Sequence, residues 1–192
     1  MNLAAKINSV AGMRLSETQL AKHALASSVA VFTLTTIHHG YGAYVYDTPW
    51  RLHAVTVSGA VTLLLAGLLK VSEFSGAPRR ANAATYAFVV VGLLVMFVGF
   101  GMFEGGYNHL VKDILYFSNV SPELMRQLYP AGRYELPNDS FFEITGVLQI
   151  LPGALTGAYL FLLLARVRHR SDKSCNESSC ASSFDVVLRS RP

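Results

Sequence analysis

Four long runs of apolar residues alternate with shorter polar segments along this chain. The runs cover residues 19–44, 49–71, 83–104 and 141–166. The length of each is close to that of a helix that crosses a bilayer, about 20 residues. In lipid, every backbone N–H and C=O must find a partner within its own segment, which a helix provides. The pattern therefore predicts an all-α fold, a polytopic membrane protein in which residues 1–170 form a bundle of four transmembrane helices.

Local signals mark where individual helices begin, bend and end. Ser16, with Gln19 three residues later, is the capping-box pattern of a helix start. Gly105-Gly106 follows the third apolar run and predicts its end, while Pro152-Gly153 predicts a kink inside the fourth. Gly153 and Gly157 form a GxxxG step, which either lets a neighbouring helix approach closely or reflects the high glycine content of membrane helices.

The long connection between the third and fourth runs has signals of its own. Ser121-Pro122-Glu123 predicts the start of a short helix that lies at the membrane interface. The stretch LYPAGRYELPNDSFF, rich in aromatic residues and proline, suits contact with a membrane-protein partner. After the fourth run, residues 171–192 are Ser-rich, and we predict that they form a disordered cytoplasmic tail.

Composition and charge indicate the class of protein and its orientation. Hydrophobic residues make up 52% of the 192 residues and charged residues 15%, which argues against a soluble domain. The net charge of +4 is not arranged as a basic stripe for nucleic acid. Lysine and arginine gather at three flanks, which the positive-inside rule places in the cytoplasm, so both termini are expected inside a plasma (inner) membrane and the long connection outside. These cations are Lys6, Arg14, Lys22, Lys70, Arg79, Arg80, Arg166, Arg168, Arg170 and Lys173.

Ionisable residues from all four predicted helices fall at their outer ends. His38 and His39 lie near the end of the first run, His53 near the start of the second, and Glu104 and Glu143 at the outer ends of the third and fourth. Titratable groups at membrane depth are costly, and they usually face the bundle interior at a functional site. Imidazole and carboxylate are ligands of zinc, copper and iron, so this gathering predicts a transition-metal site.

The ligands that we expect first are His39, His53, Glu104 and His109. His38 points about 100° away from His39 around a helix, so the two are not expected to face one metal ion without distortion. Further polar residues are expected to support these ligands or to line a ligand pocket open to the outside. They are His38, Asp47, Asn108, Glu143 and Gln149.

Purely structural roles are open for the same residues. Arg51 and Lys112 can compensate the carboxylates by ion pairing without any metal. An outer histidine can also rest among the lipid head groups. Glu143 follows Ser140 by three residues, so a second capping box predicts that its carboxylate serves the start of the fourth helix.

Three classes of function fit this pattern. A metal-dependent oxidoreductase or hydrolase would act on a lipid or small molecule at the outer face. A b-type haem protein needs axial histidines from two helices at matched depth, a pair that we do not find at mid-membrane, so haem is the weaker alternative. A non-enzymatic transporter subunit, sensor or assembly factor would use the polar cluster to bind a ligand or partner. The sequence contains no HExxH, GxSxG, Walker or dinucleotide motif to narrow the choice.

Overall fold

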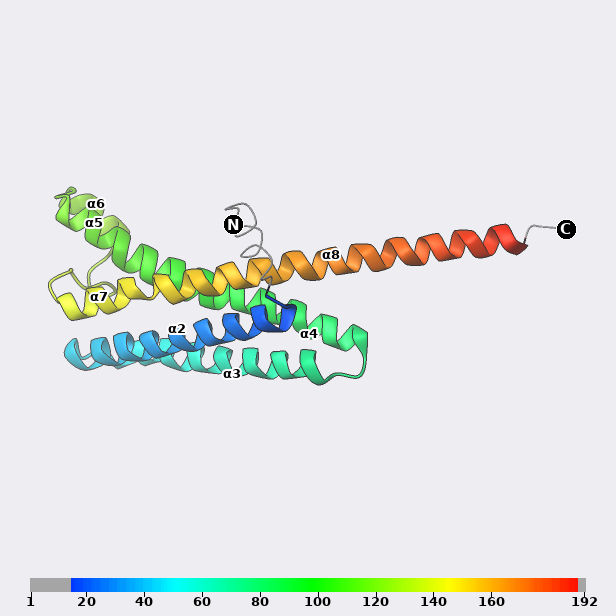
Figure 1. Ribbon diagram of the computed structural model, residues 1–192. Helices are drawn as coiled ribbons and strands as arrows, with labels where there is room; N and C mark the ends of the chain where they lie inside the picture. Colours follow the sequence, from blue (N-terminus) through cyan, green and yellow to red (C-terminus); the bar gives the residue numbers. More distant parts are fainter. Residues whose placement is uncertain (1–14, 190–192) are drawn as a thin grey trace, which may run out of the picture.

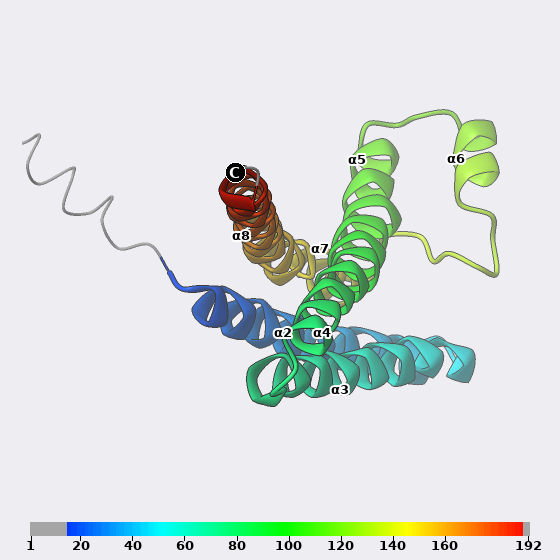
Figure 2. The same cartoon turned by 90° about the vertical axis from the view of Figure 1, so that its right-hand side faces the viewer.

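A computed structural model of the protein describes residues 15–189, and the side chains of residues 15–170; this part of the chain is a bundle of antiparallel helices without a β-strand (Figure 1). α2 packs against α3 and α8, and η2 packs against α8. α6 lies beside α5 at one end of the bundle (Figure 2). In chain order the elements are α2 (Glu17–Val45), η1 (Pro49–Arg51), α3 (Leu52–Phe74), α4 (Pro78–Val91), η2 (Gly92–Val111), α5 (Lys112–Phe117), α6 (Pro122–Leu128), α7 (Ser140–Leu148) and α8 (Ile150–Arg189).

Four helical segments of the described chain are long and apolar enough to cross a membrane, as the apolar runs predict. Large apolar side chains cover the outside of the bundle, and those of Leu63 and Leu94 are 75% and 63% exposed. Such a surface suits contact with acyl chains rather than with water. The segments are Glu17–Val45, Pro49–Phe74, Pro78–Phe117 and Ser140–Arg170.

Two of the predicted helix starts are confirmed. Ser16 Oγ accepts the Gln19 N–H at 3.1 Å, and Gln19 Oε1 accepts the Ser16 N–H at 2.7 Å, which completes the capping box of α2. Ser121 Oγ accepts the Leu124 N–H at 3.3 Å and caps α6. These bonds satisfy N–H groups that have no partner inside the helix.

The third apolar run does not end at Gly105-Gly106, so the boundary predicted at residue 104 is wrong. The helix continues through η2 to Val111 and through α5 to Phe117. Glycine permits a helix to end but does not force it to. Here Gly105 instead allows close packing, because a side chain at this position would meet the backbone of Gly146 and Ile150. Glu104 therefore lies inside a continuous helix.

η2 is wound more widely than an α-helix, with π-type hydrogen bonds over Gly92–Val111. A π-helix bonds residue i to residue i+5 and has about 4.4 residues per turn, against 3.6 in an α-helix. Five of the six buried positions of η2 recur at intervals of four or five residues, as this winding requires, and Phe100 directly precedes one of them. The six positions are Gly92, Met96, Phe100, Gly101, Gly105 and His109.

The fourth segment is interrupted close to the predicted kink. α7 ends at Leu148 and α8 begins at Ile150, so the break falls at Gln149. Pro152 explains this position, because proline has no N–H to donate to the Leu148 carbonyl, four residues earlier, and its ring crowds that group. Beyond the break, α8 continues to Arg189 through the segment for which disorder is predicted. No glycine or proline interrupts residues 158–191.

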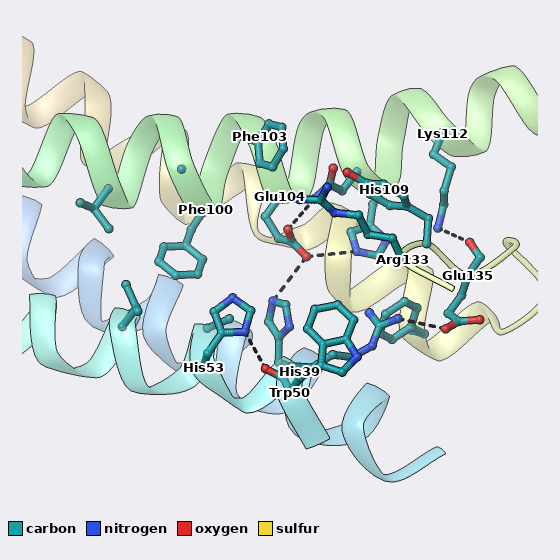
Figure 3. Close-up of a pocket in the computed structure, with 18 of the residues that line it drawn as sticks. His39, Trp50, His53, Phe100, Phe103, Glu104, His109, Lys112, Arg133 and Glu135 are labelled. Atoms are coloured by element: carbon teal, nitrogen blue, oxygen red, sulfur yellow. Dashed lines mark hydrogen bonds and ion pairs between the residues drawn. The ribbon is translucent and has the colours of Figure 1, made fainter. Parts of the chain in front are cut away.

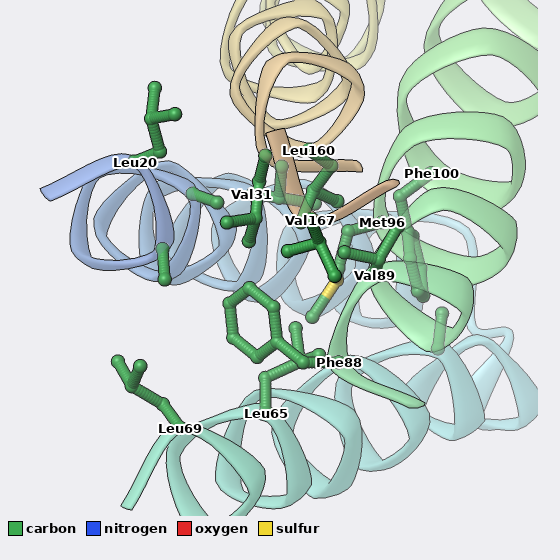
Figure 4. Packing of buried hydrophobic residues seen from close by; sticks show 14 residues of the cluster. Leu20, Val31, Leu65, Leu69, Phe88, Val89, Met96, Phe100, Leu160 and Val167 are labelled. Carbon is green, nitrogen blue, oxygen red and sulfur yellow. The ribbon is translucent and has the colours of Figure 1, made fainter. Parts of the chain in front are cut away.

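The GxxxG step of α8 does allow close approach to a neighbouring helix. A side chain added at Gly153 would meet the backbone of Gly101, and one added at Gly157 would meet the ring of Phe97. Both contacts are with η2, so small residues on the two helices form one seam. A cluster of buried apolar side chains from α2, α3, α4, η2 and α8 fills the bundle beside it (Figure 4).

This seam yields a matched pair of glycine substitutions in one helix. Gly101→Ala should lower the melting temperature of the detergent-purified protein, because the new methyl group meets Gly153 and overpacking costs about 1–3 kcal/mol. Gly106→Ala is the control, since the nearest atom to its added methyl group is a backbone oxygen of η2 itself at 3.9 Å. Equal melting temperatures for the two variants would contradict the seam.

Candidate metal centre

Three histidine side chains converge on the carboxylate of Glu104. Figure 3 shows two of them, His39 and His109. Glu104 Oε1 lies 3.3 Å from His39 Nε2, 3.7 Å from His109 Nε2 and 3.8 Å from His38 Nε2. All three imidazoles are buried. Among them, His38, Glu104 and His109 each offer one ligand atom within 4.8 Å of the others, a group that can hold a metal ion.

The winding of η2 explains how one helix contributes two members of this group. Glu104 and His109 are five residues apart, and in an α-helix their side chains would point about 140° apart. With about 4.4 residues per turn, the angle falls to about 50°. Both side chains can then face α2, which contributes His38 and His39.

The two adjacent histidines of α2 both approach Glu104. Their rings are perpendicular, with centroids 4.9 Å apart and an interplanar angle of 87°. His38 belongs to the group with Glu104 and His109, whereas His39 approaches Glu104 from outside that group.

The outward nitrogens of two histidines are held by acceptors. His109 Nδ1 lies 2.6 Å from Glu143 Oε2, and His38 Nδ1 lies 3.1 Å from the carbonyl oxygen of Phe142. Because an acceptor at Nδ1 places the proton there, Nε2 of a neutral ring is left with a free lone pair. Nε2 of His38 and both ring nitrogens of His39 are buried and have no hydrogen bond in the described chain.

Glu143 does not cap its helix, so the second capping box is wrong. Asp139, one residue earlier than predicted, caps α7 by accepting the Phe142 N–H at 3.0 Å. Glu143 instead lies between two side chains of the third segment. Its Oε2 faces His109, and its Oε1 accepts a hydrogen bond from Lys112 Nζ at 2.8 Å.

Asp139 is well placed for its capping role. Its carboxylate accepts the Phe142 N–H and, at 2.8 Å, the hydroxyl of Tyr41 on α2. These two hydrogen bonds hold the pKa of Asp139 below its usual value, so the cap stays ionised at neutral pH. The start of α7, which carries Phe142 and Glu143, is thereby tied to α2.

Of the two cations expected to compensate the carboxylates, Lys112 does so for Glu143, whereas Arg51 pairs with Glu135 instead. Arg51 pairs with Glu135 at 3.1 Å, and Lys112 pairs with Glu143 while donating to the Glu135 carbonyl at 3.0 Å. No ion pair with lysine or arginine reaches Glu104 among the described side chains. Ion pairing alone therefore leaves this carboxylate without a cation.

The other predicted site residues are spread around the cluster. His53 lines the cavity beside Glu104, with Nδ1 2.6 Å from the Trp50 carbonyl oxygen, and lies outside the group with His38 and His109. Asn108 donates to Glu104 Oε2 at 2.6 Å. Gln149 is fully buried, and its Oε1 accepts the Thr35 hydroxyl at 2.8 Å. Asp47 is exposed in the turn after α2.

Phe142 and Gly146 are parts of the site that the sequence does not reveal. The Phe142 ring stacks on His38 with centroids 4.2 Å apart. A side chain at Gly146 would fall on the ring of His109. Neither residue carries chemistry of its own, and only the packing of α7 against α2 and η2 gives them a role.

A cavity of about 430 Å³ opens beside Glu104, between α3 and η2. His39, His53 and His109 contribute to its wall, so the cluster is accessible to a small molecule. Comparison of the chain with models of protein families, with curated proteins and with solved structures finds no match.

Proposed function

We propose that this chain is a membrane metalloenzyme that holds a transition-metal ion among His38, His39, Glu104 and His109. The observation that carries the proposal is the approach of three imidazole Nε2 atoms to one carboxylate oxygen, at 3.3, 3.7 and 3.8 Å. Zinc, iron and copper all suit imidazole with carboxylate, and helix bundles build such sites from inward-facing side chains. Acceptors at Nδ1 of His38 and His109 support this role by directing Nε2 towards the centre.

The main alternative to a bound metal ion is a protonated His109, because its two N–H groups would face Glu104 and Glu143 at once. It does not account for His38 and His39, whose buried Nε2 atoms have no hydrogen bond in the described chain. A buried polar atom without a partner costs about 1–3 kcal/mol. A metal ion would satisfy these nitrogens together, which a single proton on His109 does not.

Haem fits these histidines less well than a single ion does. Axial ligands stand on opposite faces of the macrocycle. The rings of His38 and His109 instead contact each other edge to face, with centroids 4.5 Å apart and an interplanar angle of 89°. This contact leaves no space for a macrocycle between them.

The surroundings of the cluster suit hydrolysis or oxidation of a bound molecule. A metal ion supplies Lewis acidity and lowers the pKa of a bound water. Asn108 fixes the orientation of Glu104 through its hydrogen bond. His53 stands on the wall of the same cavity, where an imidazole can accept or donate a proton.

We place the metal centre at the extracytoplasmic face of a plasma (inner) membrane, with both termini in the cytoplasm. The cluster and the α5–α7 connection lie at one end of the bundle, and the turn between α3 and α4 lies at the other (Figure 1). Lys70, Arg79 and Arg80 flank this turn in the sequence, and the positive-inside rule assigns such a basic end to the cytoplasm. Lys6 and Arg14, which support the same orientation, fall outside the described residues.

Cysteine labelling tests this orientation in intact cells. In the proposed orientation, an impermeant maleimide should label Arg126→Cys on α6 and leave the native Cys175 and Cys180 unmodified until the cells are opened. The exposed position of Arg126 makes it a suitable site. Labelling of the native cysteines in intact cells would place the C-terminus outside and refute the assignment.

Elemental analysis of detergent-purified protein tests the metal centre itself. We expect about one zinc, iron or copper ion per chain and no haem absorbance. The double variant His38→Ala/His109→Ala should lose the metal, while His23→Ala, whose ring stacks on Tyr159 away from the cluster, should keep it. Chelation should also lower the melting temperature of the wild type, because a bound ion stabilises the folded state. A folded wild type that neither contains nor takes up any of these metals would refute the proposal.

Glu143→Gln separates a supporting role from ligation. This substitution keeps the shape of the side chain but removes the charge that holds His109 Nδ1 and Lys112. Loss of such a partner typically weakens metal affinity about 10–100-fold, which metal titration against a competing chelator measures. Glu123→Gln, at an exposed ion pair with Arg126, is the matched control. Unchanged affinity in Glu143→Gln would contradict the supporting role.

A further inference from the structure

The cavity beside Glu104 changes character along its length (Figure 3). Towards the connection between α5 and α7, it is lined by the cationic side chains of Arg51, Lys112 and Arg133. In the other direction, towards the middle of the spans, its lining is apolar. The apolar residues are Ala54, Val57, Leu94, Val95, Phe100 and Phe103.

The apolar part of the cavity reaches the outer surface of the bundle. Val57, Leu94 and Phe103 line the cavity and are also 45%, 63% and 51% exposed. All three lie within segments that are apolar enough to cross a membrane, so their exposed surface faces lipid. A molecule can therefore enter sideways from the bilayer, between α3 and η2.

Of the three cationic side chains that line the cavity, one has no ion-pair partner among the described side chains. Arg51 is held by Glu135 and Lys112 by Glu143. Arg133 lines the cavity and has no ion pair among the described side chains. An anionic group entering the cavity would find this guanidinium, which suits the two oxygens of a carboxylate or phosphate.

We infer that the cavity binds a single-chain amphiphile with an anionic head, a carboxylate or a phosphate, and presents that head to the metal centre. The inference rests on the proposed function for the role of the metal. The head lies between Arg133 and Glu104, and the chain lies along Val57, Leu94 and Val95. A volume of about 430 Å³ is in the usual range of small-molecule sites, about 300–1,000 Å³, and the rest of a longer chain stays in the bilayer.

The chain carries its own reporter for this site, because Trp50 is its single tryptophan and lines the cavity. Bromine quenches tryptophan fluorescence at short range, so brominated amphiphiles can be titrated into phosphatidylcholine nanodiscs that hold the protein. We expect saturable quenching by 6-bromododecanoate or 6-bromododecyl phosphate, which carry the bromine nearer the head and so nearer Trp50, and only weak, non-saturable quenching by the neutral 6-bromododecanol. The two anionic probes distinguish a fatty acid from a phosphate monoester.

Two pairs of variants locate the head and the chain. Arg133→Gln should weaken binding of the anionic probe by about threefold or more, whereas Arg126→Gln, exposed on α6, should not. Leu94→Phe narrows the apolar part and should reduce saturable quenching, whereas Leu63→Phe, exposed on α3 away from the cavity, should not. Equal quenching by the acid and the alcohol, or no effect of Arg133→Gln, would overturn the inference.

Metal content measured on the same samples separates this inference from the proposed function. If the protein holds metal, chelation should weaken binding of the anionic probe, because the head loses a cationic neighbour. Saturable, Arg133-dependent binding to a protein that never holds metal would refute the metal centre and leave the amphiphile site standing. Metal-loaded protein that does not prefer the anionic probe would refute the amphiphile site alone.

Discussion

The chemistry of this bundle depends on one carboxylate that has no lysine or arginine to pair with among the described side chains. Glu104 lies among three imidazoles, while the two buried cations of the region, Arg51 and Lys112, are held by other carboxylates. Taking an ion out of water costs on the order of several kcal/mol unless an opposite charge lies beside it. Within ion-pair distance of Glu104, positive charge can come from the histidines or from an ion that they bind. The Nε2 atoms of His38 and His39, which are buried without a hydrogen bond in the described chain, favour the ion.

The winding of η2 links the packing of the bundle to this site. The same buried stripe carries Gly101 and Gly105, which allow α7 and α8 to come close, and His109, one turn further on. Packing along the glycines fixes the rotation of η2 about its axis, and that rotation decides where His109 points. Gly146 contributes from the other side, because its missing side chain leaves room for the imidazole. Residues without reactive side chains thus set the geometry of the candidate metal ligands.

The sequence predicts position along the helix axes well and rotation about those axes poorly. Apolar run length gives the four spans, and His38, His39 and Glu104 fall at one end because their positions along those runs require it. Which histidine of α2 lies close enough to share an ion with His109 depends instead on side-chain direction and on the π-type winding of η2. The hydropathy pattern predicts neither of these. The helix end predicted from glycine is wrong because that prediction also depends on a neighbouring helix. Gly105-Gly106 is compatible both with a helix end and with a close helix contact, and only the partner helix decides between them.

The charged groups around the cluster also determine from which side it can be reached. Glu135 binds Arg51 through its side chain and Lys112 through its carbonyl oxygen, so it ties the α5–α7 connection to both α5 and η1. This contact lies at the end of the cavity nearest the α5–α7 connection, whereas the apolar residues at the other end are half exposed between α3 and η2. Electrostatic interactions are stronger where water is excluded. A site partly covered on its aqueous side and open towards lipid would hold an ion firmly and still admit a substrate from the bilayer.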